Sequence, residues 1–313
     1  MVNILALFMQ VFLLVMMLVP GVLVRKMQWG DNGFAKGVSN LILYVAQLAL
    51  IISPFIRAYD KSMLSGIIGV FVISFFAHVL FYGIALVFIP GVSTAIKKVL
   101  RFSVVFSNAG YMGIPLIEAV LGSDAAIYAT IYNISFNLFM WSLGRYIYTE
   151  DRKYISPLKM FINPAAVAVY IGLFIFFLPI EGYIPAVIIS AIDMLKGLVA
   201  PLSMMLVGYH MAGADFKNLF KTKSMFIAMA VRLIVCPVVL FGILKLFSVL
   251  GIYHNEIAVT VSLLAAATPA ATSTSMLAEK HDGDTKTSGM LVPASTILAV
   301  LTMPLVALLL KFY

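Results

Sequence analysis

The chain has 313 residues, of which 63% are hydrophobic and only 11% are charged, whereas soluble globular domains carry about 25% charged residues. This composition excludes an ordinary soluble enzyme. The formal net charge of +8 does not indicate nucleic-acid binding, because the basic residues occur singly or in pairs at the ends of apolar segments. The single cysteine, Cys236, excludes a disulfide framework and a cysteine metal site.

Apolar segments long enough to cross a hydrocarbon core of about 30 Å recur along the whole chain. They lack the alternation of barrel strands, and lipid offers the backbone no hydrogen-bonding partner, so they are predicted to be helices. The first segment has no basic region before it and no cleavage site after it, which favours a retained span over a signal peptide. The predicted fold is an all-α integral membrane protein with ten transmembrane helices, at about 3–24, 37–57, 62–89, 98–121, 124–148, 161–179, 184–210, 222–249, 255–279 and 283–312.

The ten predicted spans divide into two groups of five at the polar stretch 149–159. The two halves resemble each other weakly, since Asp124 follows the fourth span as Asp284 follows the ninth. An odd number of spans in each half gives the halves opposite orientations, an arrangement typical of transporters. We therefore predict two inverted five-helix repeats, 1–150 and 151–313, with scaffold and transport parts drawn from both.

Basic residues concentrate on one predicted side of the membrane. Arg25, Lys98 and Arg152 are among the many on that side, whereas Arg57 and Lys61 are among the few on the other. The positive-inside rule then places both termini outside the cytoplasm. We expect a multi-pass protein of the plasma membrane.

Two predicted spans contain sequences that disfavour an unbroken helix. In the fourth span, residues 107–116 read SNAGYMGIPL, which places an asparagine, two glycines and a proline about ten residues into the membrane. In the ninth, residues 267–275 read ATPAATSTS, a proline followed by four hydroxyl-bearing residues. Proline removes an amide donor, and glycine lets the backbone leave helical geometry. Both spans are predicted to be interrupted near mid-membrane.

An interrupted helix predicts a cavity, because its freed amides and carbonyls must face protein or water. A half-helix that begins at mid-membrane directs unpaired amides and its positive dipole end toward that cavity, which suits a carboxylate without a lysine or arginine. The opposing carbonyl ends suit a cation or a ligand hydroxyl. The alternative is a proline kink used for helix packing, but interruptions in corresponding spans favour a binding site.

The stretch from Asn108 to Leu116, together with Thr268-Pro269 and residues 277–280, LAEK, resembles the auxin efflux carrier family. That family includes bacterial malate and malonate permeases and the plant PIN-formed auxin exporters. The resemblance covers the whole chain. It implies ten helices in two inverted repeats, with the fourth and ninth helices crossing at their breaks and a carboxylate substrate held beside the crossover.

The resemblance also implies roles for individual residues. Asn108 would bind or orient the carboxylate, Pro115 and Pro269 would form the breaks, and the fifth helix would contribute a polar wall. Residues 47–49, QLA, stand where the family often has a proline, and Ser273 stands where it often has an asparagine, which leaves the identity of the substrate open. The predicted substrate-binding residues are Asn108, Ala109, Gly110, Gly113, Asn137, Thr268, Thr272 and Ser273.

Three further polar residues are candidates for coupling or structural roles. Arg232 lies about ten residues into the eighth span, where a charge is costly, so it should face the interior and pair with a carboxylate or with carbonyls; a functional and a helix-tethering role fit equally. Glu118 is a candidate proton carrier. Because it lies near a membrane interface, a role as a solvated anchoring residue is favoured. Asn133 lies one helical turn from Asn137 and shares its face.

The predicted function is that of a secondary transporter for small organic anions such as malate, malonate or auxin-like carboxylates, with alternating access around the crossover. A membrane sensor or a channel of the same fold is the alternative. No nucleotide-binding, zinc-protease or serine-hydrolase motif occurs in the sequence, so we expect no enzymatic activity, cofactor or metal. Expected partners are the carboxylate, the bilayer, a proton or sodium ion for coupling and a second copy of the chain, but no nucleic acid.

Overall fold

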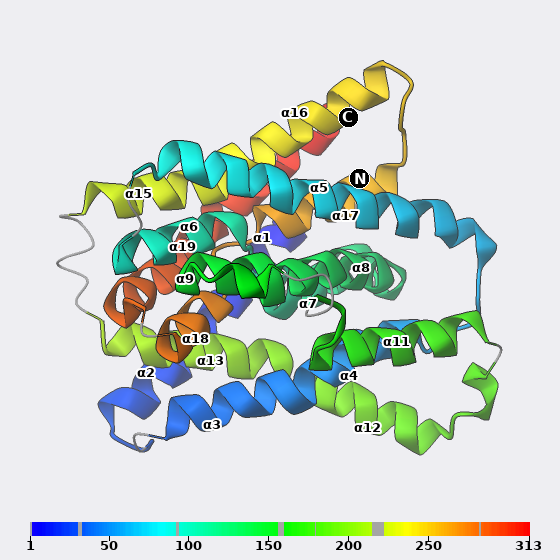
Figure 1. The fold of residues 1–313 in the computed structure, drawn as a ribbon. Helices are drawn as coiled ribbons and strands as arrows, with labels where there is room; N and C mark the ends of the chain where they lie inside the picture. Colours follow the sequence, from blue (N-terminus) through cyan, green and yellow to red (C-terminus); the bar gives the residue numbers. More distant parts are fainter. Residues whose placement is uncertain are drawn as a thin grey trace.

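A computed structural model describes residues 2–30, 33–91, 94–155, 160–178, 180–214, 222–281 and 283–313. Helices are the only regular elements among these residues, as predicted for an all-α protein (Figure 1). Within the described parts of the chain, six helical segments are long and apolar enough to cross a membrane, at Ile4–Lys26, Phe34–Phe55, Lys61–Phe88, Ala186–Ala212, Lys223–Val249 and Thr285–Phe312. The ten-span count and the inverted repeat stay predictions.

Most predicted spans consist of consecutive helical pieces. In the first half these are α1 (Ile4–Met16), α2 (Leu18–Lys26), α3 (Phe34–Leu41), the π-helix η1 (Ile42–Ala46), α4 (Gln47–Ile52), α5 (Leu64–Phe88), α6 (Ala95–Val105), the π-helix η4 (Ala109–Gly113), α7 (Ile114–Leu121), α8 (Ser123–Phe139), the π-helix η5 (Met140–Gly144) and α9 (Arg145–Thr149). In the second half they are α11 (Pro164–Phe177), α12 (Ala186–Gly197), α13 (Val199–Ala212), α15 (Lys223–Ala230), the π-helix η8 (Val231–Val235), α16 (Cys236–Val249), α17 (Glu256–Ala267), α18 (Ser273–Lys280) and α19 (Thr285–Ala307).

The interrupted elements occupy the middle of the molecule. Figure 1 shows α5, α15 and α16 along one edge, α3 and α12 along the opposite edge, and α6, α7, α8 and α18 between them. The outer helices expose apolar side chains that lipid would cover. None of the residues of α12 is buried, for example, and Val187 and Met194 are 72% and 77% exposed. This distribution of apolar surface is that of a protein whose solvent is a bilayer.

The first and seventh spans approach each other through glycine. A Cβ atom at Gly21 in α2 would overlap the backbone carbonyl of Met205 in α13, and one at Gly208 in α13 would overlap that of Leu18 in α2. Small residues of this kind let membrane helices pack backbone against backbone. The reciprocal contact holds α2 and α13 together over a full turn.

The predicted junction between the two halves, 149–159, is described only as far as Ile155. The side chain of Asn163 caps the following α11 by accepting a hydrogen bond of 3.0 Å from the amide of Ala166. Pro164 occupies the first turn of that helix, where a missing amide costs nothing. With 14 residues, α11 is shorter than the predicted span at 161–179.

Candidate functional site

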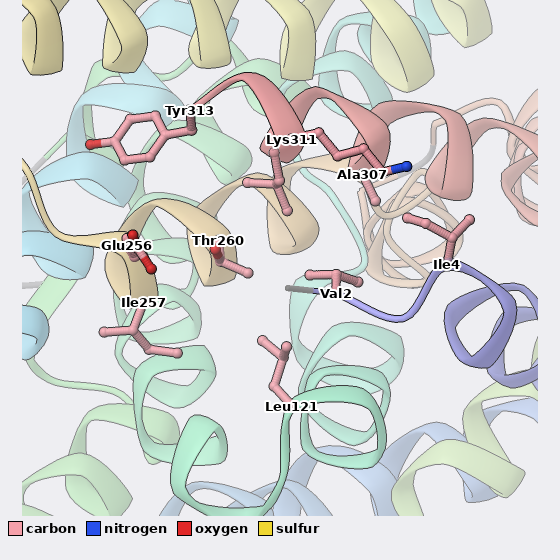
Figure 2. Close-up of a pocket in the computed structure, with 10 residues that line it drawn as sticks. Val2, Ile4, Leu121, Glu256, Ile257, Thr260, Ala307, Lys311 and Tyr313 are labelled. Atoms are coloured by element: carbon pink, nitrogen blue, oxygen red, sulfur yellow. The ribbon is translucent and has the colours of Figure 1, made fainter.

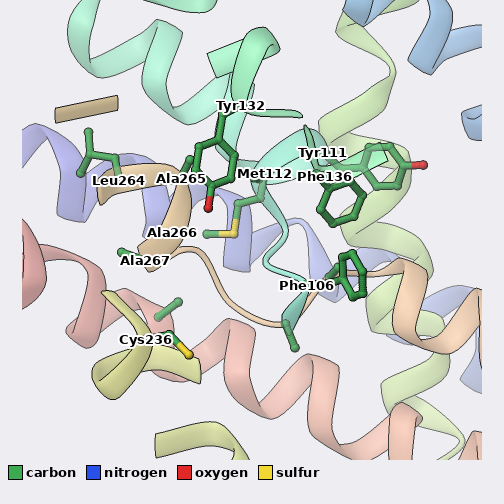
Figure 3. Packing of buried hydrophobic residues seen from close by; sticks show 14 of the residues in the cluster. Phe106, Tyr111, Met112, Tyr132, Phe136, Cys236, Leu264, Ala265, Ala266 and Ala267 are labelled. Atoms are coloured by element: carbon green, nitrogen blue, oxygen red, sulfur yellow. The ribbon is translucent and has the colours of Figure 1, made fainter. Parts of the chain in front are cut away.

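The fourth and ninth predicted spans are both interrupted, and the two interruptions contact each other (Figure 3). The backbone amide of Asn108 donates to the carbonyl of Pro269 at 2.8 Å, and the amide of Ala271 donates to the carbonyl of Phe106 at 3.0 Å. These bonds form an antiparallel bridge between two extended segments. Each interruption therefore satisfies backbone groups that the other leaves free, as a membrane interior requires.

The position of the first interruption corrects the role predicted for Pro115. The chain leaves helical geometry after Val105, and Pro115 lies farther along, in the first turn of α7. The π-helical turn η4 precedes it directly, and such local adjustments accommodate the missing amide of a membrane proline. The break forms at 106–108 because that backbone finds its partners in the other segment. Pro269 lies within the second interruption.

A small cavity adjoins the crossover. Its volume of about 10 Å³ is roughly the room that one water molecule needs. It is lined by Gln47, Asn108, Gly110, Tyr111, Asn133, Phe136, Ala271, Thr272 and Ser273. Four of the predicted substrate-binding residues, Asn108, Gly110, Thr272 and Ser273, therefore lie together around one space between the two half-helices.

Hydrogen bonds connect the cavity to the second and fifth spans. Tyr111 donates from its hydroxyl to Gln47 Oε1 at 3.0 Å, and Gln47 Nε2 donates to Asn137 Oδ1 at 3.1 Å. Asn137 in turn donates from Nδ2 to the backbone carbonyl of Asn133 at 2.8 Å. Asn137 thus supports the lining residues but does not itself line the cavity. Across the crossover, Asn108 Nδ2 donates to Thr272 Oγ1 at 3.3 Å.

Two polar side chains at the cavity have no hydrogen-bond partner among the described residues. Both side-chain atoms of Asn133 are unpaired although the residue is 1% exposed, and the hydroxyl of Ser273 is unpaired at 5% exposure. Buried polar groups are nearly always hydrogen-bonded in folded proteins. These atoms are therefore available to a ligand. Asn133, which the sequence places only as a coupling or structural residue, lines this cavity.

The remaining predicted residues do not line the cavity. Ala109 and Gly113 belong to η4, and a Cβ at Gly113 would lie 3.5 Å from the methyl group of Thr268. The Thr268 hydroxyl donates to the carbonyl of Ala265 at 2.7 Å. Glu118 lies near the far end of α7 and forms a 2.8 Å ion pair with Lys196, which agrees with an anchoring role.

Sequence reasoning missed Gln47, Tyr111 and Phe136 as lining residues. Gln47 carried a signal, because it is a polar residue in an apolar span and belongs to the stretch 47–49, which departs from the family. Another signal exists only in the structure: η1 ends directly before Gln47, and η4 begins directly after Asn108. Single π-helical turns are frequent at functional sites.

Arg232 lies behind the crossover and not in the cavity. Its side chain is 1% exposed, and its guanidinium donates to the carbonyl of Val104 at 2.9 Å and to the carbonyl of Ala266. Of the two pairings predicted for it, the structure shows the one with carbonyls.

A larger cavity of about 380 Å³ lies away from the crossover, near both chain termini (Figure 2). Its lining includes Leu121, Glu256, Thr260 and Lys311. Thr260 precedes Thr268 by two turns of α17, which corresponds to about 12 Å along a helix. This cavity is therefore separate from the crossover site.

The chain matches the protein family described as Membrane transport protein over residues 6–157 and 152–307. It belongs to the auxin efflux carrier family of membrane transporters. No curated protein matches the chain. Membership confirms the family predicted from the sequence. The family is one of membrane transporters and not of enzymes, so the chain is a multi-pass membrane transporter. In this auxin efflux carrier family member, both interrupted helices and the unpaired Asn133 meet at the crossover.

Proposed function

We propose that this chain is a secondary transporter for small organic anions of the malate, malonate or auxin-like class, which binds the carboxylate at the crossover and alternates access around it. The observation that carries the proposal is that two half-helices begin at one cavity that also holds the unpaired Asn133 amide. Among the described residues no charged side chain lines that cavity, so recognition of an anion there depends on backbone dipoles and neutral donors.

Helix dipoles provide the positive potential. The half-helix formed by η4 and α7 begins after Asn108, and α18 begins after Thr272. The first turn of each has amides without partners inside the helix, of which those of Thr274 and Ser275 in α18 donate to the carbonyls of Ala271 and Thr272. Each N-terminus corresponds to about half a positive charge. The two together approximate one positive charge, which suits one carboxylate group.

Side-chain donors add specificity. Asn133 Nδ2 and Ser273 Oγ are unpaired, and Asn108 Nδ2 makes only a long bond of 3.3 Å to Thr272. A carboxylate accepts up to four hydrogen bonds, so it can satisfy all three donors. This fit supports a carboxylate over a cation, which would face these donors unfavourably.

The size of the cavity supports alternating access. A volume of about 10 Å³ cannot hold even the smallest organic acid, so the elements around the crossover must separate when substrate enters. Polar contacts on both half-helices link them to the seventh span. Lys196 pairs with Glu118 of α7 at 2.8 Å, and the His210 ring lies 4.0 Å from Glu279 of α18. We propose that these contacts break and re-form as the site opens.

The surroundings of the transporter follow from the same proposal. We place it in the plasma membrane with both termini outside the cytoplasm, because the basic loops then face inward. The exposed apolar surface of α12 suits lipid or a second copy of the chain, and a homodimer is the proposed assembly.

Counterflow in proteoliposomes tests the function. Vesicles loaded with unlabelled malate, malonate, lactate or indole-3-acetate receive external labelled acid, and the wild type should accumulate at least one of them. Asn108→Ala should lower the initial rate about tenfold or more, since a lost hydrogen bond to a charged ligand costs about 1.5–3 kcal/mol. Asn40→Ala, an exposed asparagine in α3, is the matched control and should transport normally.

Each other outcome has a defined meaning. If no acid exchanges in vesicles that contain folded protein, the organic-anion proposal fails and a sensor becomes the better reading. Flux without saturation or counterflow would identify a channel. Wild-type rates in Asn108→Ala would remove Asn108 from the binding site.

A further inference from the structure

Arg232 is the largest fully buried side chain among the described residues. It lies in the π-helical turn η8, between α15 and α16, where a charge is costly unless it is compensated. None of the ion pairs found in the described part of the chain involves Arg232. Its compensation must therefore come from another source.

The guanidinium binds the C-terminal ends of α6 and α17, the two half-helices that precede the interruptions. It donates to the carbonyl of Val104 at 2.9 Å and approaches that of Val105 at 3.5 Å, at the end of α6. It also donates to the carbonyl of Ala266, at the end of α17. One side chain thus joins the carbonyl ends of the two helices that the crossover interrupts.

The charges of this arrangement balance. The C-terminal end of a helix corresponds to about half a negative charge, so the ends of α6 and α17 together approximate one negative charge. Arginine remains protonated in proteins and contributes one positive charge. The half-helix ends therefore compensate the charge of Arg232 without a carboxylate among the described residues, where only its Nε has no hydrogen-bond partner.

The guanidinium of Arg232 is enclosed by neighbouring side chains, since the residue is 1% exposed. Its Cζ atom lies 5.0 Å from the centre of the Phe81 ring, and the π-system of such a ring attracts a cation. One helical turn after Arg232, the buried Cys236 places its Sγ 3.8 Å from the same Val104 carbonyl. The positive group is enclosed and permanently attached to the chain.

In transporters with interrupted helices, half-helix carbonyl ends of this kind coordinate the coupling Na⁺. We propose that Arg232 is a built-in cation that occupies this carbonyl position at the crossover, so that neither the fold nor transport by this chain depends on sodium. The statement about transport rests on the proposed carrier function. The statement about the cation position does not.

Thermal unfolding of the purified protein in detergent tests the cation position without any transport. The wild-type melting temperature should be the same, within about 1 °C, in sodium, potassium and choline chloride of equal concentration. Arg232→Met should melt several degrees lower, and 20 mM guanidinium should raise its melting temperature because the free cation fills the vacated carbonyls. Lys245→Met, which removes a basic residue of the adjoining α16, is the control and should gain nothing from guanidinium.

A sodium-specific rise in the wild-type melting temperature would overturn the proposal, as would an Arg232→Met variant that melts like the wild type. If Arg232→Met does not fold, Arg232→Lys replaces it. The single ammonium of lysine should restore folding only in part, with a melting temperature below that of the wild type, and full restoration would contradict the bridging role.

Counterflow then tests the consequence for transport. The wild-type rate should change less than twofold when choline replaces sodium, and guanidinium should restore part of the lost rate in Arg232→Met but none in Asn108→Ala. Transport that stops without sodium would refute the inference and leave the carrier assignment standing. Absence of transport of every acid would refute the carrier assignment, while the melting experiments would still decide the role of Arg232.

Discussion

Gly110→Ala is the substitution that tests the geometry of the crossover site most directly. A Cβ atom at position 110 would lie 2.6 Å from Asn133 Oδ1, whereas ordinary contacts begin at 3.4 Å. The Asn133 amide would have to retreat by about 0.8 Å, and because it is 1% exposed, the space nearest to it is the small cavity that it lines. Overpacking of this kind costs about 1–3 kcal/mol.

If Asn133 binds the carboxylate, this cost appears in transport. A free energy of 1–3 kcal/mol corresponds to a reduction of about 5- to 150-fold, and it should be measured as the initial counterflow rate over a range of substrate concentrations. The melting temperature of the same preparation separates a local effect on binding from a loss of folding.

Gly83→Ala is the matched control, because a Cβ at position 83 in α5 meets nothing within 4 Å. It should transport like the wild type and melt at the same or a higher temperature, since alanine favours the helix by about 1 kcal/mol over glycine. Normal transport by Gly110→Ala would refute the reasoning, because the approach of Gly110 to Asn133 would then have no part in binding.

Two further predictions concern packing and topology. Gly208→Leu should lower the melting temperature by several degrees because its side chain would collide with the Leu18 backbone, whereas Gly197→Leu, with open space around it, should melt like the wild type; equal melting would show that the first and seventh spans are not closely packed. Arg152→Cys should react with a membrane-impermeant maleimide only after intact cells are permeabilised, while Lys61→Cys should react at once; the reverse pattern would invert the topology.

The sequence alone determines the solvent of this protein and which two spans are interrupted. A chain with 63% hydrophobic residues in segments of about 20 must cross a bilayer as helices. Glycine and proline within the fourth and ninth spans are local disruptions that act wherever the chain folds, so the existence of two interruptions follows from the residues themselves. The family follows from the same two stretches.

The exact place of the first break could not be read from the sequence. Pro115 is the strongest local disruptor there, yet the helix opens at 106–108 because the backbone pairs with Pro269 and Ala271, residues that are distant in the chain. Partner groups and not intrinsic propensity decide where a membrane helix opens.

Tertiary structure also decided which polar residues share a site. The asparagine at 133, one turn before Asn137, looked like a secondary member of the same face, but packing places Asn133 at the cavity and Asn137 behind it. Gln47 reaches the cavity because Tyr111 donates a hydrogen bond to it, a contact between the second and fourth spans.

The role of Arg232 depends most on the fold. A buried arginine in a sequence predicts a partner, but only the convergence of α6 and α17 shows that the partner is a pair of helix ends. Local sequence sets the propensity of each segment to bend, whereas long-range contacts determine which polar and charged groups compensate one another.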